Sequence, residues 1–233
     1  MPQSLPAQSL PVLIFDLDGT LTDSKPGIVG CLREVLDARK ISGYGSLDRF
    51  IGPPVEEWAA DLLPHGNAED RLALARDYRA CYDRMGWSNN SVYSGVAEML
   101  AQLHRDGFPL YVCTSKHEHF AVRILESFGI AQCFNAIYGD KIDYESHGKS
   151  DLLSRVLVQQ AIDRASAWMV GDRSFDIEAA RLNGIRCLAV AWGYGTPEEL
   201  AQADAVAATP ADVIGIVRAH ASGPAAAPRS AIA

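Results

Sequence analysis

The sequence has few cysteines, no long apolar run and no excess of positive charge. Its five cysteines are scattered without the close pairs of a zinc or redox motif, so we expect reduced thiols in the core. They are Cys31, Cys81, Cys113, Cys133 and Cys187. No apolar run reaches the ~18 residues of a membrane helix, and the chain starts without the pattern of a secretory signal. We therefore expect a cytoplasmic protein that does not bind membranes.

The charged residues are predominantly acidic. Lys and Arg number 21 against 29 Asp and Glu, which gives a formal net charge of -8. Such a chain does not favour broad electrostatic binding to a nucleic-acid polymer, although it allows a local positive pocket for one phosphate. Apolar residues make up 48% of the 233 residues, which is enough for a sizeable core.

The first part of the chain combines one apolar strand with a long helical stretch. Val12–Phe15 is entirely apolar and predicts a buried strand, although periodicity alone leaves a piece of buried helix open. Apolar residues then recur at helical spacing over Pro26–Arg39, Val55–Leu63 and Glu69–Met85, with no strand pattern among them. We therefore expect an all-helical domain over residues 24–94, the helical insert.

From Val96 onward, predicted helices and strands alternate. The predicted strands are Phe108–Cys113, Phe134–Tyr138, Ala167–Val170, Cys187–Ala191 and Ala205–Ala207. This alternation favours a Rossmann-like, doubly wound α/β fold with a parallel sheet. We expect residues 1–23 and 95–221 to form this core and residues 222–233, rich in Ala, Pro and Ser, to be a mobile tail.

Two carboxylates follow the first predicted strand. Asp16 and Asp18 are two residues apart, so their side chains point to the same side of an extended chain, and Gly19 allows a sharp turn after them. Two like charges held close together need a cation, a shared proton or a reaction to balance them. A solvated turn and the metal-binding Asp-x-Asp pair of a glycosyltransferase are the alternatives for this pair alone.

Further polar groups follow later strands. Thr114 and Ser115 come directly after one predicted strand, and Asp172 comes after another, with Asp176 four residues later. Lys149 stands in the loop before a predicted helix. Parallel strands end at one edge of their sheet, so we expect these groups to converge there with the first two carboxylates. Together they offer oxygen ligands for a hard cation, donors for phosphate oxygens and one positive charge.

These residues resemble the four motifs of the haloacid dehalogenase superfamily. Asp16–Ser24 is similar to the first motif, Thr114–Ser115 to the second, Lys149 to the third and Gly171–Asp176 to the fourth. The four occur in order, and the resemblance covers about residues 10–220.

The helical insert resembles the cap of the phosphoglycolate phosphatase and β-phosphoglucomutase branch. Three segments are most similar to a bacterial group in it described as 5'-nucleotidase-like: Phe50–Pro54, Thr114–Lys116 and Trp192–Gly195. The resemblance implies a Mg²⁺-dependent phosphatase that hydrolyses small phosphomonoesters through an aspartyl phosphate. It implies a small phosphorylated metabolite as the partner, and we expect a monomer or a weak homodimer.

The resemblance also implies roles in catalysis and metal binding. Asp16 would be the nucleophile, and Asp18 would protonate the leaving alcohol and then activate water. Asp16, the backbone carbonyl of Asp18 and the Asp172 carboxylate would hold Mg²⁺.

Other residues would bind the phosphate. Thr114 and the Ser115 amide would contact phosphate oxygens, while Lys149 would neutralise charge and brace the nucleophile. Lys141, in the same connection, is the alternative lysine. Asp176 would support the metal ligands from behind, or would merely favour a helix N-terminus.

Several residues near the motifs leave alternatives open. Arg49 could reach the substrate from the helical insert, or could be a solvated loop residue. An exposed first helical turn accounts for His117 and His119 better than catalysis does, and Lys116 has no assigned role. For Trp192 and Tyr194 we favour packing over a contact with a nucleotide base.

Other activities fit less well. Asp18 argues against dehalogenation, since that branch lacks the second acidic residue. Phosphonate hydrolysis needs a lysine in the cap, and none lies between Lys40 and Ser94, although Lys25 is not excluded. A β-phosphoglucomutase-like phosphomutase is the nearest enzymatic alternative. A non-catalytic binding protein with the same fold is the second.

Overall fold

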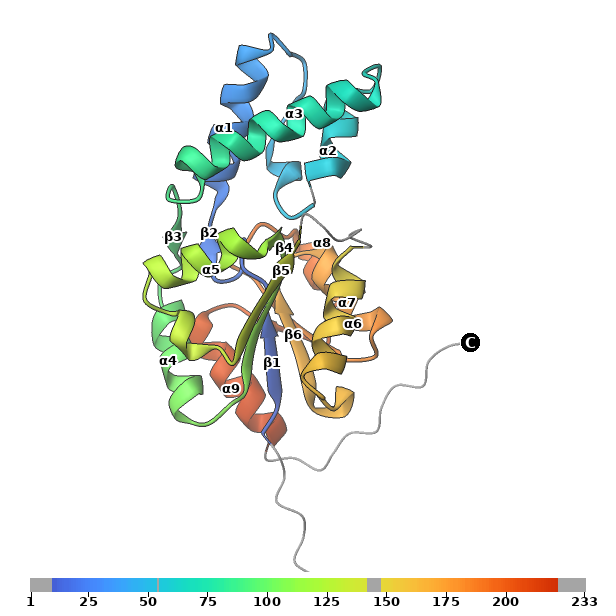
Figure 1. The fold of residues 1–233 in the computed structure, drawn as a ribbon. Helices are drawn as coiled ribbons and strands as arrows, with labels where there is room; N and C mark the ends of the chain where they lie inside the picture. Colours follow the sequence, from blue (N-terminus) through green and yellow to red (C-terminus); the bar gives the residue numbers. More distant parts are fainter. Residues whose placement is uncertain (1–9, 54, 142–147, 222–233) are drawn as a thin grey trace, which may run out of the picture.

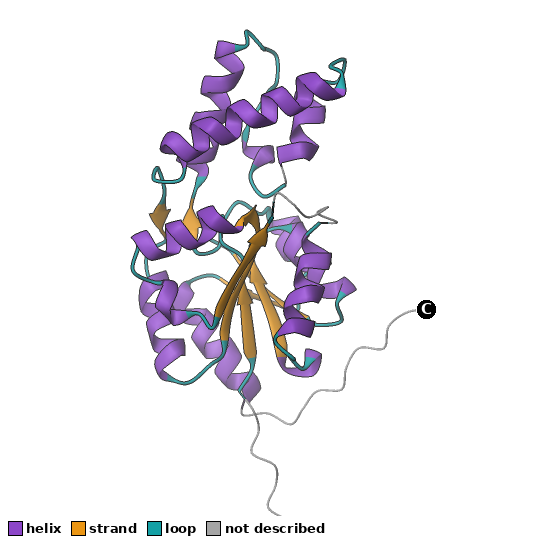
Figure 2. Ribbon diagram, in the orientation of Figure 1, coloured by secondary structure: helices purple, strands orange, loops and turns teal. Residues whose placement is uncertain are grey.

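A six-stranded parallel sheet forms the centre of the molecule (Figures 1 and 2). The computed structural model describes residues 10–53, 55–141 and 148–221, so the expected mobile tail lies outside the described residues. The strands lie in the order β5-β4-β1-β6-β7-β8. Their bounds are β1 Val12–Phe15, β4 Leu110–His117, β5 Ala136–Asp140, β6 Ala167–Gly171, β7 Arg186–Val190 and β8 Ala205–Ala207.

The central strand β1 explains why its sequence is apolar without alternation. Leu13 pairs with Leu110 of β4 on one side and with Trp168 of β6 on the other. Leu13, Ile14 and Phe15 are fully buried because helices cover both faces of the sheet. The chain builds the sheet outward from β1 in one direction and then in the other. Such a reversal puts the ligand site of a doubly wound sheet at the carboxyl ends of its strands, here called the carboxyl edge.

Helices cover the two faces in separate groups. The first group packs on the face that carries Leu13 and Phe15. It comprises α4 Val96–Arg105, α5 Glu118–Ser127 and α9 Pro210–Ala221. The second group, α6 Lys149–Gln159 and α7 Ser174–Leu182, packs on the face that carries Ile14. A short helix, α8 Pro197–Leu200, follows β7. The expected doubly wound α/β core is therefore confirmed.

The helical insert lies beyond the carboxyl edge, on the side toward which the strand arrows of β4 and β5 point (Figure 2). Its helices are α1 Lys25–Ala38, α2 Val55–Leu62 and α3 Ala68–Cys81, with short turns η1 Asp48–Phe50 and η2 Tyr82–Gly86. They enclose their own apolar cluster, to which α1 contributes Ile28, Leu32 and Leu36 at helical spacing. Phe120 and Tyr194, which come from outside the insert, pack against this cluster.

Two features of the insert and of its junction with the core differ from the sequence-based expectation. The last helix does not run to Met85: it ends at Cys81, and η2 is a π-helical turn closed by the Trp87 amide on the Tyr82 carbonyl. A two-residue strand, β3 Ser91–Val92, pairs antiparallel with β2 Thr22–Asp23. Both segments are too short for a hydrophobic period to reveal them.

The cysteines behave as expected, since all five are free and buried. Among the described residues, no helix is long and apolar enough to cross a membrane.

Candidate active site

The first predicted catalytic residue, Asp16, directly follows β1. Its amide donates to the Val170 carbonyl at 2.8 Å, which holds this backbone at the carboxyl edge. The Lys149 ammonium lies 2.7 Å from Asp16 Oδ1 and 2.5 Å from Asp176 Oδ1. Lys149 is the first residue of α6, so its expected place in the preceding loop is wrong. Gly148, at φ +89°, directly precedes the helix, a backbone conformation that glycine adopts readily.

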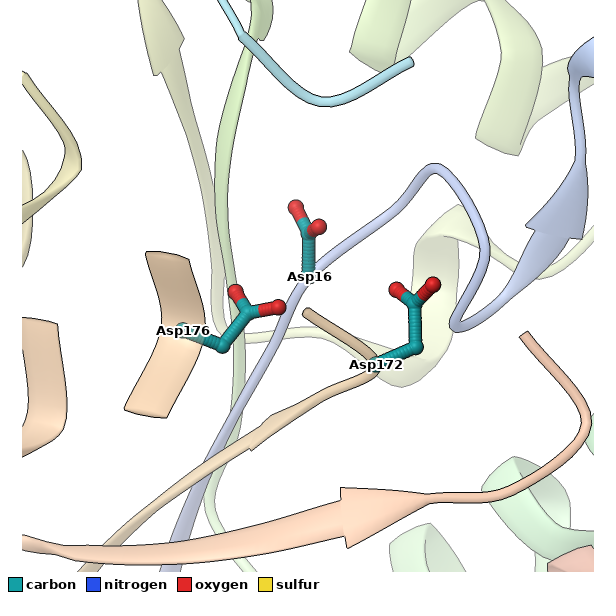
Figure 3. Close-up of side chains that lie close together, drawn as sticks. All are labelled: Asp16, Asp172 and Asp176. Atoms are coloured by element: carbon teal, nitrogen blue, oxygen red, sulfur yellow. The ribbon is translucent and has the colours of Figure 1, made fainter. Parts of the chain in front are cut away.

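Three carboxylates converge at this position (Figure 3). Oxygens of Asp16, Asp172 and Asp176 lie within 4.8 Å of one another, and all three residues are buried. We call this group the carboxylate cluster. Burial, together with Asp176 and Asp16, raises the pKa of Asp172 to about 8. Burial also raises the pKa of Asp176, although Lys149 opposes this.

The carboxylate cluster has more negative charge than its neighbours balance. Burial alone would lower the pKa of Lys149, but Asp16 and Asp176 outweigh it and raise that pKa, so the lysine stays protonated. This ammonium contacts Asp16 and Asp176, so its single positive charge cannot balance all three carboxylates of the cluster when they are ionised. A hard divalent cation with oxygen ligands would restore the balance, and the donor set therefore fits Mg²⁺.

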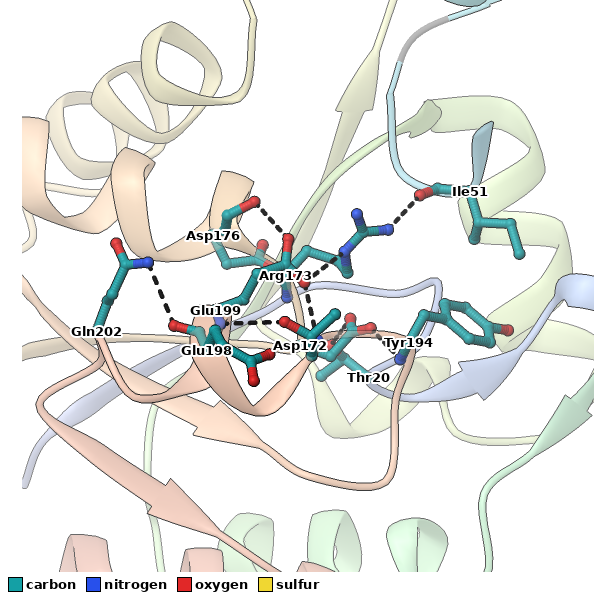
Figure 4. A network of polar contacts seen from close by, with 11 residues as sticks. Thr20, Ile51, Asp172, Arg173, Asp176, Tyr194, Glu198, Glu199 and Gln202 are labelled. Atoms are coloured by element: carbon teal, nitrogen blue, oxygen red, sulfur yellow. Dashed lines mark hydrogen bonds and ion pairs between the residues drawn. The ribbon is translucent and has the colours of Figure 1, made fainter. Parts of the chain in front are cut away.

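Asp172 is held in place by groups for which the sequence predicts no role (Figure 4). Thr20 Oγ1 donates to one carboxylate oxygen at 3.0 Å, and the Tyr194 amide donates to the other at 2.8 Å. A Cβ on Gly19 would lie 2.2 Å from Asp172 Oδ2, and one on Gly193 would lie 2.4 Å from Asp172 Cβ. The glycines that flank Tyr194 in the sequence were the available signal for this close packing.

Asp176 caps a helix and also faces the buried lysine. Its Oδ2 accepts the Arg173 amide at 3.0 Å, which caps the start of α7, while Oδ1 faces Lys149. Arg173 also connects the site to the helical insert, because its guanidinium donates to the Ile51 carbonyl at 3.0 Å (Figure 4). Its Nε lies 3.3 Å from Glu199.

The Asp18 side chain pairs with a lysine from a different strand. The Lys116 ammonium lies 2.9 Å from Asp18 Oδ2, and these side chains are only 7% and 9% exposed. The same ammonium donates to the Tyr82 hydroxyl at 2.8 Å. Burial alone would lower the pKa of Lys116, but Asp18 and Tyr82 reverse the effect and raise it. No sequence pattern predicts a role for Lys116, because neither Asp18 nor Tyr82 is near it in the chain.

The predicted phosphate ligands Thr114 and Ser115 lie within β4. Thr114 is buried, and its hydroxyl accepts the Lys116 amide at 3.2 Å. The predicted end of this strand at Cys113 is wrong. The strand β4 continues to His117, which pairs with Asp140, and its register shifts between Cys113 and His117. Gly139 permits the close approach of β5: a Cβ there would lie 2.5 Å from the Lys116 carbonyl oxygen.

The remaining candidates lie outside this constellation. Arg49 is exposed in η1, with its guanidinium 4.7 Å from the centre of the neighbouring Phe50 ring. Lys141 pairs with Glu118 at 3.2 Å, so Lys149 and not Lys141 is the lysine that contacts Asp16.

The histidines and Trp192 have structural contacts. His117 caps α5, its Nδ1 accepting the amide of His119, which is exposed. Trp192 packs on the core, and its indole N–H donates to the Thr20 carbonyl at 2.9 Å.

The family described as haloacid dehalogenase-like hydrolase matches residues 13–190. The chain therefore belongs to this family of hydrolases. Tyrosine-protein kinase PtkA of Mycobacterium tuberculosis is 37% identical over 217 residues, which cover 92% of this chain and 74% of PtkA. A 5'-nucleotidase of Pseudomonas aeruginosa is 35% identical over 193 residues, covering 82% of this chain and 86% of that protein.

A phosphoglycolate phosphatase of Pectobacterium atrosepticum is 30% identical over 215 residues, covering 88% of this chain and 91% of that protein. Among solved structures, a predicted phosphatase from Clostridium acetobutylicum has a TM-score of 0.83 and 31% identity. The match covers 91% of this chain and 100% of that one. The expected family and fold are thus confirmed.

Proposed function

We propose that this protein is a Mg²⁺-dependent phosphatase that hydrolyses small phosphomonoesters through an aspartyl phosphate on Asp16. The contact of the Lys149 ammonium with Asp16, inside the carboxylate cluster, carries the proposal. A phosphomonoester is an anion that must approach an anionic nucleophile, so positive charge is the first requirement of the site. The 5'-nucleotidase and phosphoglycolate phosphatase among the relatives support the same substrate class.

The excess negative charge of the carboxylate cluster supports the choice of metal. Asp16, the Asp18 backbone carbonyl and Asp172 would hold Mg²⁺, and Asp176 would steady this arrangement through Lys149. When bound, the ion would neutralise the cluster and polarise the phosphoryl group.

Two bond exchanges make up the reaction. In the first, an Asp16 oxygen forms a bond to phosphorus, the bond to the leaving oxygen breaks, and Asp18 gives its proton to that oxygen. In the second, Asp18 takes a proton from water, the water oxygen bonds to phosphorus, the bond between Asp16 and phosphorus breaks, and inorganic phosphate leaves. Thr114, the Ser115 amide and Lys149 would bind the phosphoryl oxygens throughout.

The helical insert would act as a cap that selects the substrate. Residues 24–94 would form this domain, with residues 1–23 and 95–221 as the catalytic core. Its position beyond the carboxyl edge and its separate apolar cluster support this division. Arg49 is a candidate for contacting the substrate from the cap.

A second candidate function is phosphoryl transfer to a tyrosine hydroxyl. The identity with a tyrosine-protein kinase over nearly the whole chain favours it. In this alternative, the acceptor oxygen would come from a protein side chain instead of water.

A panel of substrates tests these functions. The panel comprises a nucleoside 5'-monophosphate, phosphoglycolate, β-glucose 1-phosphate, and ATP with a tyrosine peptide, each with Mg²⁺ and with EDTA. We expect release of inorganic phosphate that requires Mg²⁺ and is abolished by Asp16→Asn. Metal-independent turnover, or unchanged turnover by Asp16→Asn, would contradict the proposal. Isomerised sugar phosphate or phosphotyrosine as the main product would instead identify a mutase or a kinase.

A further inference from the structure

A buried polar contact joins the helical insert to the proposed acid/base residue. Asp18 lies in the turn after β1, Lys116 near the end of β4, and Tyr82 in η2 of the insert. The Lys116 ammonium lies between the other two, 2.9 Å from the carboxylate and 2.8 Å from the hydroxyl. Three segments far apart in the sequence therefore meet at one ammonium.

The contact leaves one Asp18 oxygen available. Oδ2 is occupied by Lys116, while Oδ1 is buried without a hydrogen-bond partner among the described residues. An unpartnered buried carboxylate oxygen is costly unless a ligand uses it. Fixing Oδ2 also fixes the direction of Oδ1, so Lys116 determines where Asp18 can exchange a proton.

Tyr82 is itself held by both parts of the molecule. Its ring centre lies 5.2 Å from that of Phe120, in α5, and 5.8 Å from that of Tyr78, in α3 of the insert. Tyr82 is 3% exposed, so the Lys116 contact is sheltered from water. A displacement of the insert away from the core would separate the Tyr82 hydroxyl from the ammonium.

We propose that Lys116 is a positioning residue that orients Asp18 for proton transfer, and that Tyr82 of the helical insert holds Lys116 in the orienting position. The inference rests on the proposed function, because it gives Asp18 the acid/base role. It adds a physical link between the seating of the insert and chemistry in the core. In the first step the proton still moves from Asp18 to the leaving oxygen, and Lys116 exchanges none.

Two aryl phosphates that differ in their leaving group provide the test. Phenyl phosphate needs a proton on its leaving oxygen, whereas p-nitrophenyl phosphate has a good leaving group and needs it far less. The parameter kcat/KM reports the steps up to departure of the alcohol, and its ratio between the two substrates does not depend on how much enzyme is folded. A loss that depends on the leaving group therefore reports on Asp18 and not on general damage.

We expect Lys116→Met to lower kcat/KM about 10- to 100-fold for phenyl phosphate and less than about threefold for p-nitrophenyl phosphate, since a well-placed general acid contributes roughly 10²–10⁴-fold. Lys116→Arg should recover part of the loss. Tyr82→Phe should show a smaller effect with the same dependence, and should add little in the Lys116→Met background because it acts through the same group.

Matched controls separate this inference from the proposed function. Lys141→Met removes an exposed lysine, and Tyr138→Phe removes a hydroxyl that accepts a hydrogen bond from Gln160; both should retain the ratio of the native enzyme. Equal losses on both substrates, or a change confined to KM, would overturn the positioning role. If Asp16→Asn still forms a phosphoenzyme, the proposed function itself fails, whatever Lys116→Met does.

Discussion

The carboxylate cluster makes an unusual prediction for Asp172→Asn: the substitution should abolish activity yet stabilise the metal-free protein at alkaline pH. Asn keeps an oxygen for the Tyr194 amide, and its amide can donate to Thr20 Oγ1, so both hydrogen bonds can persist. What disappears is one of three buried negative charges. The native carboxylate therefore costs stability when no cation balances it.

The size of this cost follows from the pKa of Asp172. Burial and the two neighbouring carboxylates raise it to about 8, from an ordinary value of about 3.9 in the unfolded chain. The folded state thus holds a proton that the unfolded state releases, and this contribution to stability is complete below about pH 4 and lost as pH rises through about 8. A difference of about four pKa units corresponds to at most on the order of 5 kcal/mol.

Thermal unfolding at pH 5 and pH 8, in EDTA and in Mg²⁺, measures the effect. If Asn recovers about half of the cost, the melting temperature in EDTA at pH 8 should rise by roughly 5–10 °C, with a smaller rise at pH 5. Mg²⁺ should stabilise the native protein more than Asp172→Asn. Asp61→Asn, at an exposed position in α2, is the control and should change neither comparison.

Two results would refute this reasoning. One is an Asp172→Asn protein that is less stable than the native protein in EDTA at pH 8 while equal to it at pH 5. The other is equal stabilisation of both proteins by Mg²⁺, which would remove Asp172 from the metal ligands.

Two further substitutions test the surroundings of the site. Gly193→Ala would bring a Cβ to 2.4 Å from Asp172 Cβ, so it should lower the free energy of unfolding by about 1–3 kcal/mol and remove most of the activity. Gly30→Ala, with open space around it, is the control and should be neutral or stabilising. Denaturant unfolding and turnover measure both effects. Arg49→Ala should raise KM by about tenfold with little change in kcat, as removal of one charge-assisted contact predicts. Arg33→Ala, at another exposed position of the insert, is the control and should leave KM unchanged. An unchanged KM for Arg49→Ala in steady-state kinetics would disprove the substrate contact.

The core of the site could be predicted from the sequence because strand ends are local features. A short apolar run followed by polar residues marks the end of a buried strand, and parallel strands end at one edge. This places Asp16 and Asp172 together although 155 residues separate them. The resemblance to the family motifs adds Lys149 as the third motif, and no spacing rule predicts its contact with Asp16.

Other parts depend on packing that leaves little trace in the sequence. The two-residue strands β2 and β3 and the turn η2 are shorter than any detectable hydrophobic period. Thr20 reaches Asp172 across 152 positions, and only the three-dimensional path of the turn after β1 shows that its hydroxyl points there. The glycines around Tyr194 permit a close approach, but only the structure shows that Asp172 is the partner.

The two buried lysines, Lys149 and Lys116, differ in how far the sequence predicts their contacts. Lys149 contacts two carboxylates that belong to the same motif set, so its role follows once that set is known. Lys116 stands beside the second motif, yet its role depends on Tyr82, which only the folding of the helical insert brings within 2.8 Å. A position whose partner comes from another domain has no local signature. Sequence patterns therefore could not predict the contacts of Lys116, the part of the site that the helical insert touches through Tyr82.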